Sequence, residues 1–306
     1  MSRISAIAVD MDGTLIGSNG LISERNLAAL RDARSAGIHI AIATGRRHSY
    51  AMKVLRGLNL PADTTVISSN GTVTRSITSQ LIRRTLLPME SALWLCDHLR
   101  DYRTALVFTF DRVGPDGEDT RGALVVEELD HLHNSIGAWM QANEPYILRS
   151  NPIETAIRAG GDNAPIQAMV CGTLEQMRGA EEALLGHEHV YVHGHSPAER
   201  IHTAHVAVHR TEYAHRDLCI VDLLPGRCSK GAALHDLCGD LQTAPENVLA
   251  IGDNWNDLPL FETAGHRVVM GNAPTELQQL AQKRGWQVGA SHDEDGVAKA
   301  IENYLR

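Results

Sequence analysis

Hydrophobic residues in this chain gather in short runs that end abruptly at an acidic or small residue. Three such runs, residues 5–9, 40–43 and 248–251, are rich in Ile, Val and Ala. Apolar runs of this length, bounded by turn residues, are typical of buried strands in a parallel sheet. We therefore expect three central strands, one of them near the far end of the chain.

An amphipathic helix is expected between the first two strands. Residues 23–36 place Leu27, Leu30 and Ala33 on one helical face, and Gly37 follows as a stop signal. Strands that alternate with such helices predict an α/β fold with a doubly wound, Rossmann-like parallel sheet.

The pattern changes character in the middle of the chain. Helices are expected at 88–102, 131–142 and 174–185, strands at 105–110, 166–171 and 190–193, and a loop at 114–122. A chain of 306 residues also suits two domains better than one core. We predict a core of residues 1–85 and 201–306, with an inserted α/β cap of residues 86–200.

Composition narrows the class of protein. The chain is 43% hydrophobic and 21% charged, as in soluble globular proteins, and its net charge of −9 argues against nonspecific nucleic-acid binding. The five cysteines show no C-x-x-C spacing, so we expect reduced thiols. No secretory signal and no apolar run of about 18 residues is found. We expect a cytoplasmic protein without a membrane partner, and the sequence leaves its oligomeric state open.

Acidic residues follow the first and the last of the three strands. Asp10 and Asp12 come after the first run, and Asp253 and Asp257 come after the last. A lone Asp-x-Asp would by itself indicate a turn or a helix cap. Carboxylates that converge at the ends of parallel strands, however, repel one another unless a cation lies among them. Hard oxygen ligands favour Mg²⁺ as that cation.

Two further motifs accompany the acidic ones. Residues 44–46, Thr-Gly-Arg, follow the second strand, and residues 229–231, Ser-Lys-Gly, open a helical stretch before the last acidic cluster. Together the four motifs resemble the haloacid dehalogenase superfamily, in particular its Cof-type branch of sugar-phosphate phosphatases. The resemblance covers about residues 4–85 and 215–305, with further family-like segments at 69–71 and 270–274.

The resemblance implies a two-step phosphoryl transfer. Asp10 would be the nucleophile that forms an aspartyl-phosphate, and Asp12 the acid that protonates the leaving group and later the base for water. The implied Mg²⁺ ligands are the Asp10 side chain, the Asp12 backbone carbonyl and Asp253. Asp257 would belong to the metal site mainly by bracing its loop.

Charge on the transferred phosphoryl group calls for preorganised donors. The donors that the resemblance assigns are Met11 N–H, the Thr44 hydroxyl, Gly45 N–H, Arg46, Asn70, Lys230 and Asn256. Lys230 is one of only four lysines in the chain. Asn70 and Thr14 could equally stabilise turns, and Asn256 could orient either phosphate or Lys230.

These assignments predict a phosphatase acting on small phosphate monoesters, and the expected substrates are sugar or polyol phosphates. Two alternatives stay open: a phosphomutase of the phosphomannomutase type, which would keep the phosphate, and a catalytically slow phosphoryl-ligand sensor. Trp255 departs from the family pattern and would either line the pocket or pack on a neighbour. Histidines cluster between residues 187 and 215, where exposed side chains are favoured over a metal site.

Overall fold

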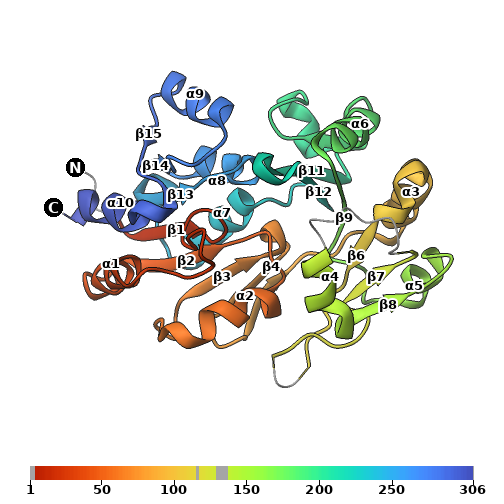
Figure 1. Ribbon diagram of the computed structural model, residues 1–306, viewed down its shortest axis with the longest axis horizontal. Helices are drawn as coiled ribbons and strands as arrows, with labels where there is room; N and C mark the ends of the chain where they lie inside the picture. Colours follow the sequence, from red (N-terminus) through yellow and green to blue (C-terminus); the bar gives the residue numbers. More distant parts are fainter. Residues whose placement is uncertain (1–3, 115–116, 129–136, 306) are drawn as a thin grey trace. The chain divides into compact units, whose positions relative to one another are not determined.

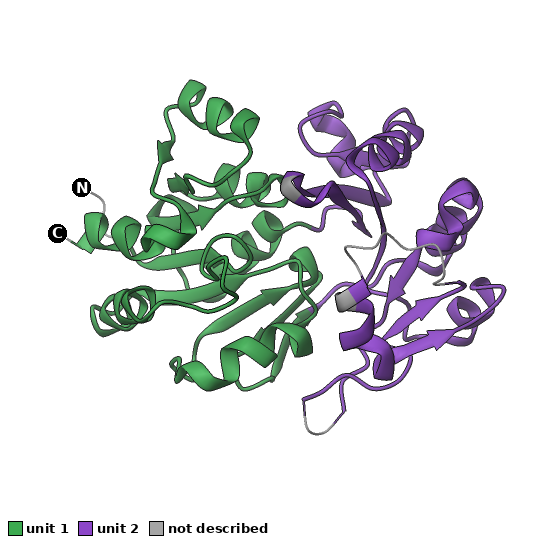
Figure 2. Ribbon diagram, viewed as in Figure 1, with its two compact units in different colours: residues 1–83, 229–306 green, residues 84–228 purple. Residues whose placement is uncertain are grey.

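The computed structural model describes residues 4–114, 117–128 and 137–305. The chain divides into two compact units, unit 1 with residues 1–83 and 229–306 and unit 2 with residues 84–228 (Figure 2). The first boundary lies two residues from the expected one. The second differs: residues 201–228, which we expected in the core, belong to unit 2.

A hairpin explains the displaced boundary. β11 (Val206–Tyr213) pairs antiparallel with β12 (Leu218–Pro225), and these two strands join β10 (Val190–Val192) and β9 (Gln167–Gly172). Backbone hydrogen bonds to strands of the insertion therefore hold this segment there. Polar residues such as His209 and Arg210 within β11 obscure its strand pattern in the sequence.

Unit 1 is built on an eight-stranded sheet. Its strands, in spatial order, are β15 (Gln287–Val288), β14 (His266–Val269), β13 (Val248–Gly252), β1 (Ala6–Asp10), β2 (His39–Ala43), β3 (Thr65–Ser68), β4 (Val73–Ser76) and β5 (Leu81–Arg84). Pairing is parallel from β15 to β3 and antiparallel between β3 and β4. The three strands expected from the apolar runs are confirmed as β1, β2 and β13, side by side (Figure 1).

Helices cover both faces of this sheet. They are α1 (Glu24–Ser35), α2 (His48–Leu55), α7 (Lys230–Asp240), α8 (Leu258–Thr263), α9 (Thr275–Lys283) and α10 (Gly296–Leu305). Ile7 and Val9 of β1 pack with α1, α2 and α10, whereas Ala6 and Ala8 pack with α7, α8 and α9. Successive side chains of a strand point to opposite faces, so each face receives its own core. The doubly wound α/β fold is confirmed.

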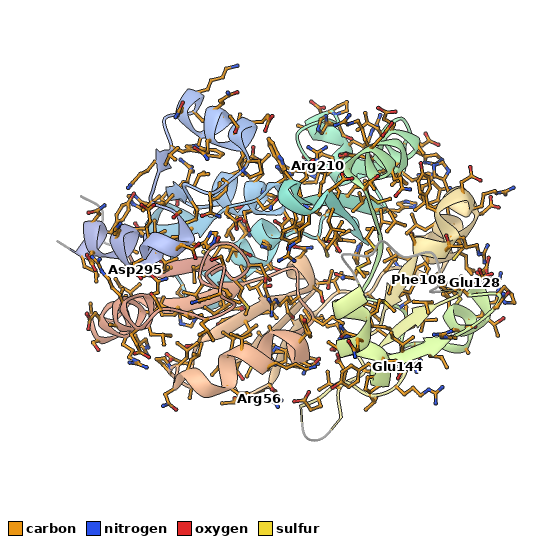
Figure 3. The ribbon with its side chains drawn as sticks, viewed as in Figure 1. Arg56, Phe108, Glu128, Glu144, Arg210 and Asp295 are labelled. Carbon is orange, nitrogen blue, oxygen red and sulfur yellow. The ribbon has the colours of Figure 1, made fainter. Side chains whose placement is uncertain are left out.

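The start of α1 shows how local sequence fixes one of these helices. Ser23 caps the helix by accepting a hydrogen bond from Asn26 N–H (3.1 Å). The same hydroxyl donates to Asp295 (2.6 Å), a residue labelled in Figure 3 that precedes α10. The cap thus joins the first and the last helix of the chain.

Unit 2 holds a seven-stranded mixed sheet with helices mainly on one face. Its strand order is β10, β11, β12, β9, β6 (Val107–Thr109), β7 (Leu124–Val126) and β8 (Ile147–Arg149). Its helices are α3 (Met89–His98), α4 (Gly137–Asn143), α5 (Glu154–Ala159) and α6 (Leu174–Leu185). Phe108 of β6, labelled in Figure 3, lies in the core that α3, α5 and α6 cover.

The expected α/β character of the insertion is confirmed where the structure describes it. Residues 131–136 of the expected helix 131–142 and residues 115–116 of the expected loop lie outside the described residues. Within the described ranges, none of the helices combines the length and hydrophobicity that crossing a membrane requires.

Candidate active site

Three carboxylates meet where the central strands of unit 1 end. β1 ends at Asp10, and β13, its parallel neighbour, runs into Asp253. Asp257 follows one short turn later, and ligand oxygens of all three buried residues lie within 4.8 Å of one another. The acidic segments of the sequence are thereby brought together, as parallel strand ends predict.

Lys230 is the cation that the structure places among these acids. It is the first residue of α7, and Ser229 caps that helix by accepting a hydrogen bond from Ala232 N–H (2.9 Å). The fully buried Lys230 Nζ donates to Asp10 Oδ1 and to Asp257 Oδ1, each at 2.6 Å. When all three carboxylates are ionised, one ammonium leaves two negative charges uncompensated, so the donor set fits a divalent cation.

Burial dominates the electrostatics of this group. It raises the pKa of Asp10 to about 7, with Asp257 and Asp12 adding to the rise and Lys230 opposing it. Burial also raises the pKa of Asp253, and nearby Asp10 and Asp257 add to the effect. For Lys230, burial alone would lower the pKa, but the charges of Asp10 and Asp257 raise it overall. A bound cation would favour the ionised form of both acids.

Asp257 is held as a brace within this group. Its Oδ2 accepts hydrogen bonds from the backbone N–H of Asp253 (3.0 Å) and Asn254 (3.1 Å), while its Oδ1 accepts from Lys230. A Cβ on Gly252 would lie 2.6 Å from the Asp257 carboxylate, so the carboxylate rests against bare backbone. These contacts fix the loop that carries Asp253.

Trp255 lies in the same loop. Its backbone N–H donates to Asn254 Oδ1 (2.9 Å), and its partly buried side chain packs against the core formed by α7, α8 and α9. Of the two expectations for Trp255, the structure shows packing on a neighbouring core.

Polar groups suited to phosphate lie beside the acids. The side chains of Asn70 and Asn256 lie close to Gly45. A Cβ atom added to Gly45 would be 3.3 Å from Asn70 Nδ2 and Oδ1 and 3.6 Å from Asn256 Nδ2. Asn256 Nδ2 donates to Asn70 Oδ1 (3.0 Å), and Asn70 N–H donates to the Thr44 carbonyl (3.0 Å). Thr44 Oγ1 accepts from Arg46 N–H (3.1 Å), which leaves its own proton available for donation.

The turn that carries Asn70 has an uncommon backbone. Ser69 and Asn70 adopt φ of 49° and 51°, and Gly71 adopts 101°. Consecutive non-glycine residues in the left-handed region are unfavourable and persist where surrounding contacts hold them. Here Gly71 lies so close to α7 that a Cβ would be 2.2 Å from the Ser229 carbonyl oxygen. The strained turn is thus packed directly against the residue that precedes Lys230.

Asp12 and Arg46 form an ion pair of their own. Arg46 Nε donates to Asp12 Oδ2 (2.7 Å) and its second nitrogen donates to Oδ1, so both carboxylate oxygens are engaged. The guanidinium also lies over the ring of Tyr50, 5.0 Å from its centroid. Contact of Arg46 with a phosphate, which the sequence suggested, stays a prediction. Met11, between the two aspartates, buries its side chain in the core.

Two further residues hold Asp253. The Thr14 hydroxyl donates to Asp253 Oδ1 (2.8 Å), which places Thr14 next to the acidic group. Asn272, whose segment the sequence marked only as family-like, reaches Asp253 Oδ2 from the turn after β14 (3.5 Å). Asn272 follows the end of β14, a strand adjacent to β13, and this position in the sequence could have identified it as a candidate.

Comparison with known proteins agrees with this geometry. The model of the haloacid dehalogenase-like hydrolase family matches residues 7–301. The chain belongs to this family. A relative from Bacillus subtilis, 5-amino-6-(5-phospho-D-ribitylamino)uracil phosphatase YwtE, is 30% identical over 317 residues, 99% of this chain and 98% of that protein. Pyridoxal phosphate phosphatase YbhA of Escherichia coli is 27% identical and covers 98% of each chain.

A solved structure supports the same fold. BT1666 of Bacteroides thetaiotaomicron, described among phosphatases of the haloalkanoate superfamily, superposes with a TM-score of 0.70 at 20% identity, covering 99% of this chain and 96% of that one. The fold of this haloacid dehalogenase-like hydrolase, with an inserted unit, is therefore shared with a solved member of its superfamily.

The histidines of this hydrolase's insertion form a row of rings. His187 lies 5.3 Å from His98 and 5.2 Å from His189, and His189 stacks on His205 at 4.7 Å, measured between ring centroids. His193 stacks more loosely on His209, at 6.3 Å. Among the described residues, the acidic trio is the one group of three or more side chains with metal-ligand spacing. The row thus lacks the geometry of a ready metal site.

Proposed function

We propose that the protein is a Mg²⁺-dependent phosphomonoesterase that works through an aspartyl-phosphate on Asp10. The observation that carries the proposal is the buried Lys230 ammonium, 2.6 Å from both Asp10 and Asp257 at the ends of the central strands. A binding protein would gain nothing from a nucleophile, a second carboxyl group and a cation arranged in this way. Membership of the hydrolase family supports the same conclusion.

Asp10 is the nucleophile in this proposal. Lys230 donates a hydrogen bond to Asp10 Oδ1. Asp10 Oδ2 attacks phosphorus as the bond between phosphorus and the leaving oxygen breaks. Lys230 keeps Asp10 oriented and offsets the charge that gathers on the phosphoryl group. Asp10, the Asp12 carbonyl and Asp253 would hold Mg²⁺, which supplies charge neutralisation at the phosphoryl oxygens.

Asp12 carries the proton in both steps. In the first step its carboxyl group gives a proton to the leaving alkoxide, and in the second its carboxylate takes a proton from the water that attacks phosphorus. Phosphate leaves and Asp10 is restored. Because a carboxylate clamped by a guanidinium cannot donate a proton, Arg46 must release Asp12 before the first step.

The remaining donors surround the phosphoryl oxygens. Thr44 offers its hydroxyl proton, Gly45 and Met11 their backbone N–H groups, and the Asn70 and Asn256 amides complete the cradle. The hydrogen bond from Asn256 Nδ2 to Asn70 Oδ1 fixes which atom of Asn70 faces Asn256. In this proposal the two amides are therefore oriented before a substrate arrives.

The substrate class is small phosphate monoesters, with sugar and polyol phosphates as first choices. YwtE is named for a phosphorylated ribityl compound and YbhA for pyridoxal phosphate, so relatives act on phosphate esters of quite different small molecules. In this proposal unit 2 acts as the cap whose contacts with the leaving group select the ester.

Free phosphate release from a panel of sugar, polyol, pyridoxal and nucleotide monophosphates tests the proposal. We expect Mg²⁺-dependent release that EDTA abolishes and that Asp10→Asn reduces below detection. A conversion of one phosphate ester into another without free phosphate would favour a mutase. Tight binding without turnover, unchanged in Asp12→Asn, would favour a sensor.

A further inference from the structure

Asn272 connects three segments through one side-chain amide. Its Nδ2 donates to the Gly13 carbonyl oxygen (2.8 Å) and reaches Asp253 Oδ2 (3.5 Å), while its Oδ1 accepts from His292 N–H (2.9 Å). A carbonyl oxygen only accepts and a backbone N–H only donates, so these partners fix the orientation of the amide. Asn272 lies in the turn after β14, the strand next to β13 in the sheet.

Asp253 is confined from the side of the nucleophile loop. Gly13 adopts φ +78°, and a Cβ there would lie 2.4 Å from Asp253 Oδ2, so the carboxylate rests directly on the glycine backbone. Thr14 donates to the other oxygen, Oδ1, at 2.8 Å. Thr14 therefore fixes one oxygen of Asp253, while Gly13 and Asn272 border the other.

This confinement acts against repulsion. Asp253 is 6% exposed, and a carboxylate oxygen of Asp253 lies within 4.8 Å of oxygens of Asp10 and Asp257, which carry charge of the same sign when ionised. Without a fixed donor at Oδ2, rotation of the Asp253 side chain away from Asp10 and Asp257 would relieve the repulsion. A cation site depends on the opposite arrangement, in which the carboxylates converge before the ion binds.

We propose that Asn272 is a positioning residue for the divalent cation: it holds Asp253, and the Gly13 carbonyl beside it, so that the carboxylates converge. The proposal rests on the proposed function, in which Asp10 and Asp253 are metal ligands. An amide suits the task because it donates to the Gly13 and Asp253 oxygens while accepting from His292. Removing a group that orients a metal ligand typically weakens metal affinity about 10–100-fold.

The turn itself offers a matched control. Gln278 of α9 donates to the carbonyl oxygens of Gly271 (3.0 Å) and Ala273 (2.8 Å), on either side of Asn272. Gln278→Ala therefore loosens the same turn without removing a contact to Gly13 or Asp253. A difference in effect between substitution of Asn272 and substitution of Gln278 therefore distinguishes a role in holding the metal ligand from a role in holding the turn.

Isothermal titration of the metal-free full chain with Mg²⁺ and with Mn²⁺ tests the proposal in the absence of substrate. We expect the Kd to rise at least about tenfold in Asn272→Ala and in Asn272→Leu, which keeps the side-chain volume, and to stay within about twofold of wild type in Gln278→Ala. Asp253→Asn gives the reference for loss of a ligand. Thermal unfolding in EDTA shows which variants are folded.

Three results would overturn the proposal. An unchanged Kd in a folded Asn272 variant, or an equal rise of the Kd in Gln278→Ala, would leave Asn272 with a structural role alone. A wild-type chain that binds neither ion would remove the basis of the proposal. Failure of the proposed function would give a different result: the wild-type chain would bind the metal ion but release phosphate from none of the esters.

Discussion

Ionisable side chains are arranged in opposite ways in the two units. In unit 1, Asp10, Asp253 and Asp257 are buried together with Lys230, and short hydrogen bonds join the ammonium to two of them. In unit 2, His98, His187, His189 and His205 form a row on partly or fully exposed positions. An acidic neighbour of the row is Glu188, whose largely exposed carboxylate lies 4.0 Å from His189 Nε2.

The two groups differ in whether their charges are buried and therefore need partners. Burying a charge is unfavourable unless a partner compensates it, so the acidic group of unit 1 depends on each of its members. Imidazoles near water can instead lose their protons, and a row of neutral rings needs no partner. Perturbation of the first region should therefore have large effects, and perturbation of the second should have small ones.

Removal of Lys230 should have the largest effect. Lys230→Met leaves three buried carboxylates without their cation, so we expect a stability loss of about 3–5 kcal/mol in EDTA. Phosphate release should fall by about 10²–10³-fold or more, because charge neutralisation at the nucleophile is lost. Urea unfolding and the phosphate assay measure the two effects.

Lys299, an exposed lysine of α10, provides the matched control. Lys299→Met should change stability by less than about 0.5 kcal/mol and leave phosphate release unchanged. Retention of activity in Lys230→Met would contradict both the proposed mechanism and the contrast between the units.

The sequence allowed prediction of the acidic group because simple rules place it. Asp10 and Asp253 each follow a short apolar run, and parallel strands bring such exits to one edge of a sheet. Lys230 could be expected there through the family resemblance of residues 229–231. The fold class followed from the same alternation of strands and helices, which β1, α1 and β2 confirm.

Contacts that depend on side-chain direction could not be predicted in this way. Nothing in the spacing of Arg46 indicates that its guanidinium turns toward Asp12, and an Asn after Gly271 is an ordinary turn signal. The segment 206–225 was misplaced because polar residues interrupt the strand pattern of β11, and its pairing with β12 is a long-range property. Local periodicity contains no information on either.

A buried histidine in unit 1 should give an intermediate effect that depends on pH. Burial, with Arg75 and Arg56 adding to it, lowers the pKa of His48 from 6.5 to about 4, and its Nε2 lies 3.2 Å from Ser79 Oγ. The unfolded chain then takes up a proton before the folded one does. Stability should fall as the pH drops from about 6.5 to 4, by up to about 3 kcal/mol.

The contribution of His48 is isolated by comparison with His48→Gln, whose amide can still reach Ser79. The contribution of Asp10 to the pH dependence of stability has the opposite sign. Because its pKa is raised, the folded state gains stability as the pH falls through about 7. The quantity to measure is therefore the difference in unfolding free energy between wild type and variant at each pH. A difference that stays constant between pH 7 and 4 would show that His48 is not held neutral.

The histidine row should give the smallest effect. Burial, followed by the neighbouring His98 and His189, lowers the pKa of His187, whereas Glu188 raises it. The backbone N–H of His189 donates to His187 Nδ1 (3.3 Å), which requires a lone pair there and so favours the neutral ring. Arg200, which donates to the His187 carbonyl oxygen (3.4 Å), adds a further positive charge nearby. His187 should therefore contribute stability that is lost as the pH falls below about 6.5.

NMR titration of the His187 ring in the full chain measures this coupling directly. The pKa of His187 should lie below 6.5 in wild type and rise toward that value in His98→Gln, because a neighbour that can become charged is removed. His195→Gln changes an exposed histidine that is not one of the four members of the row, and it should leave the titration unchanged. A His187 pKa that lies at or above 6.5 and does not change in His98→Gln would show that the rings do not interact electrostatically. The two units would then differ only in burial, and not in how their charges are coupled.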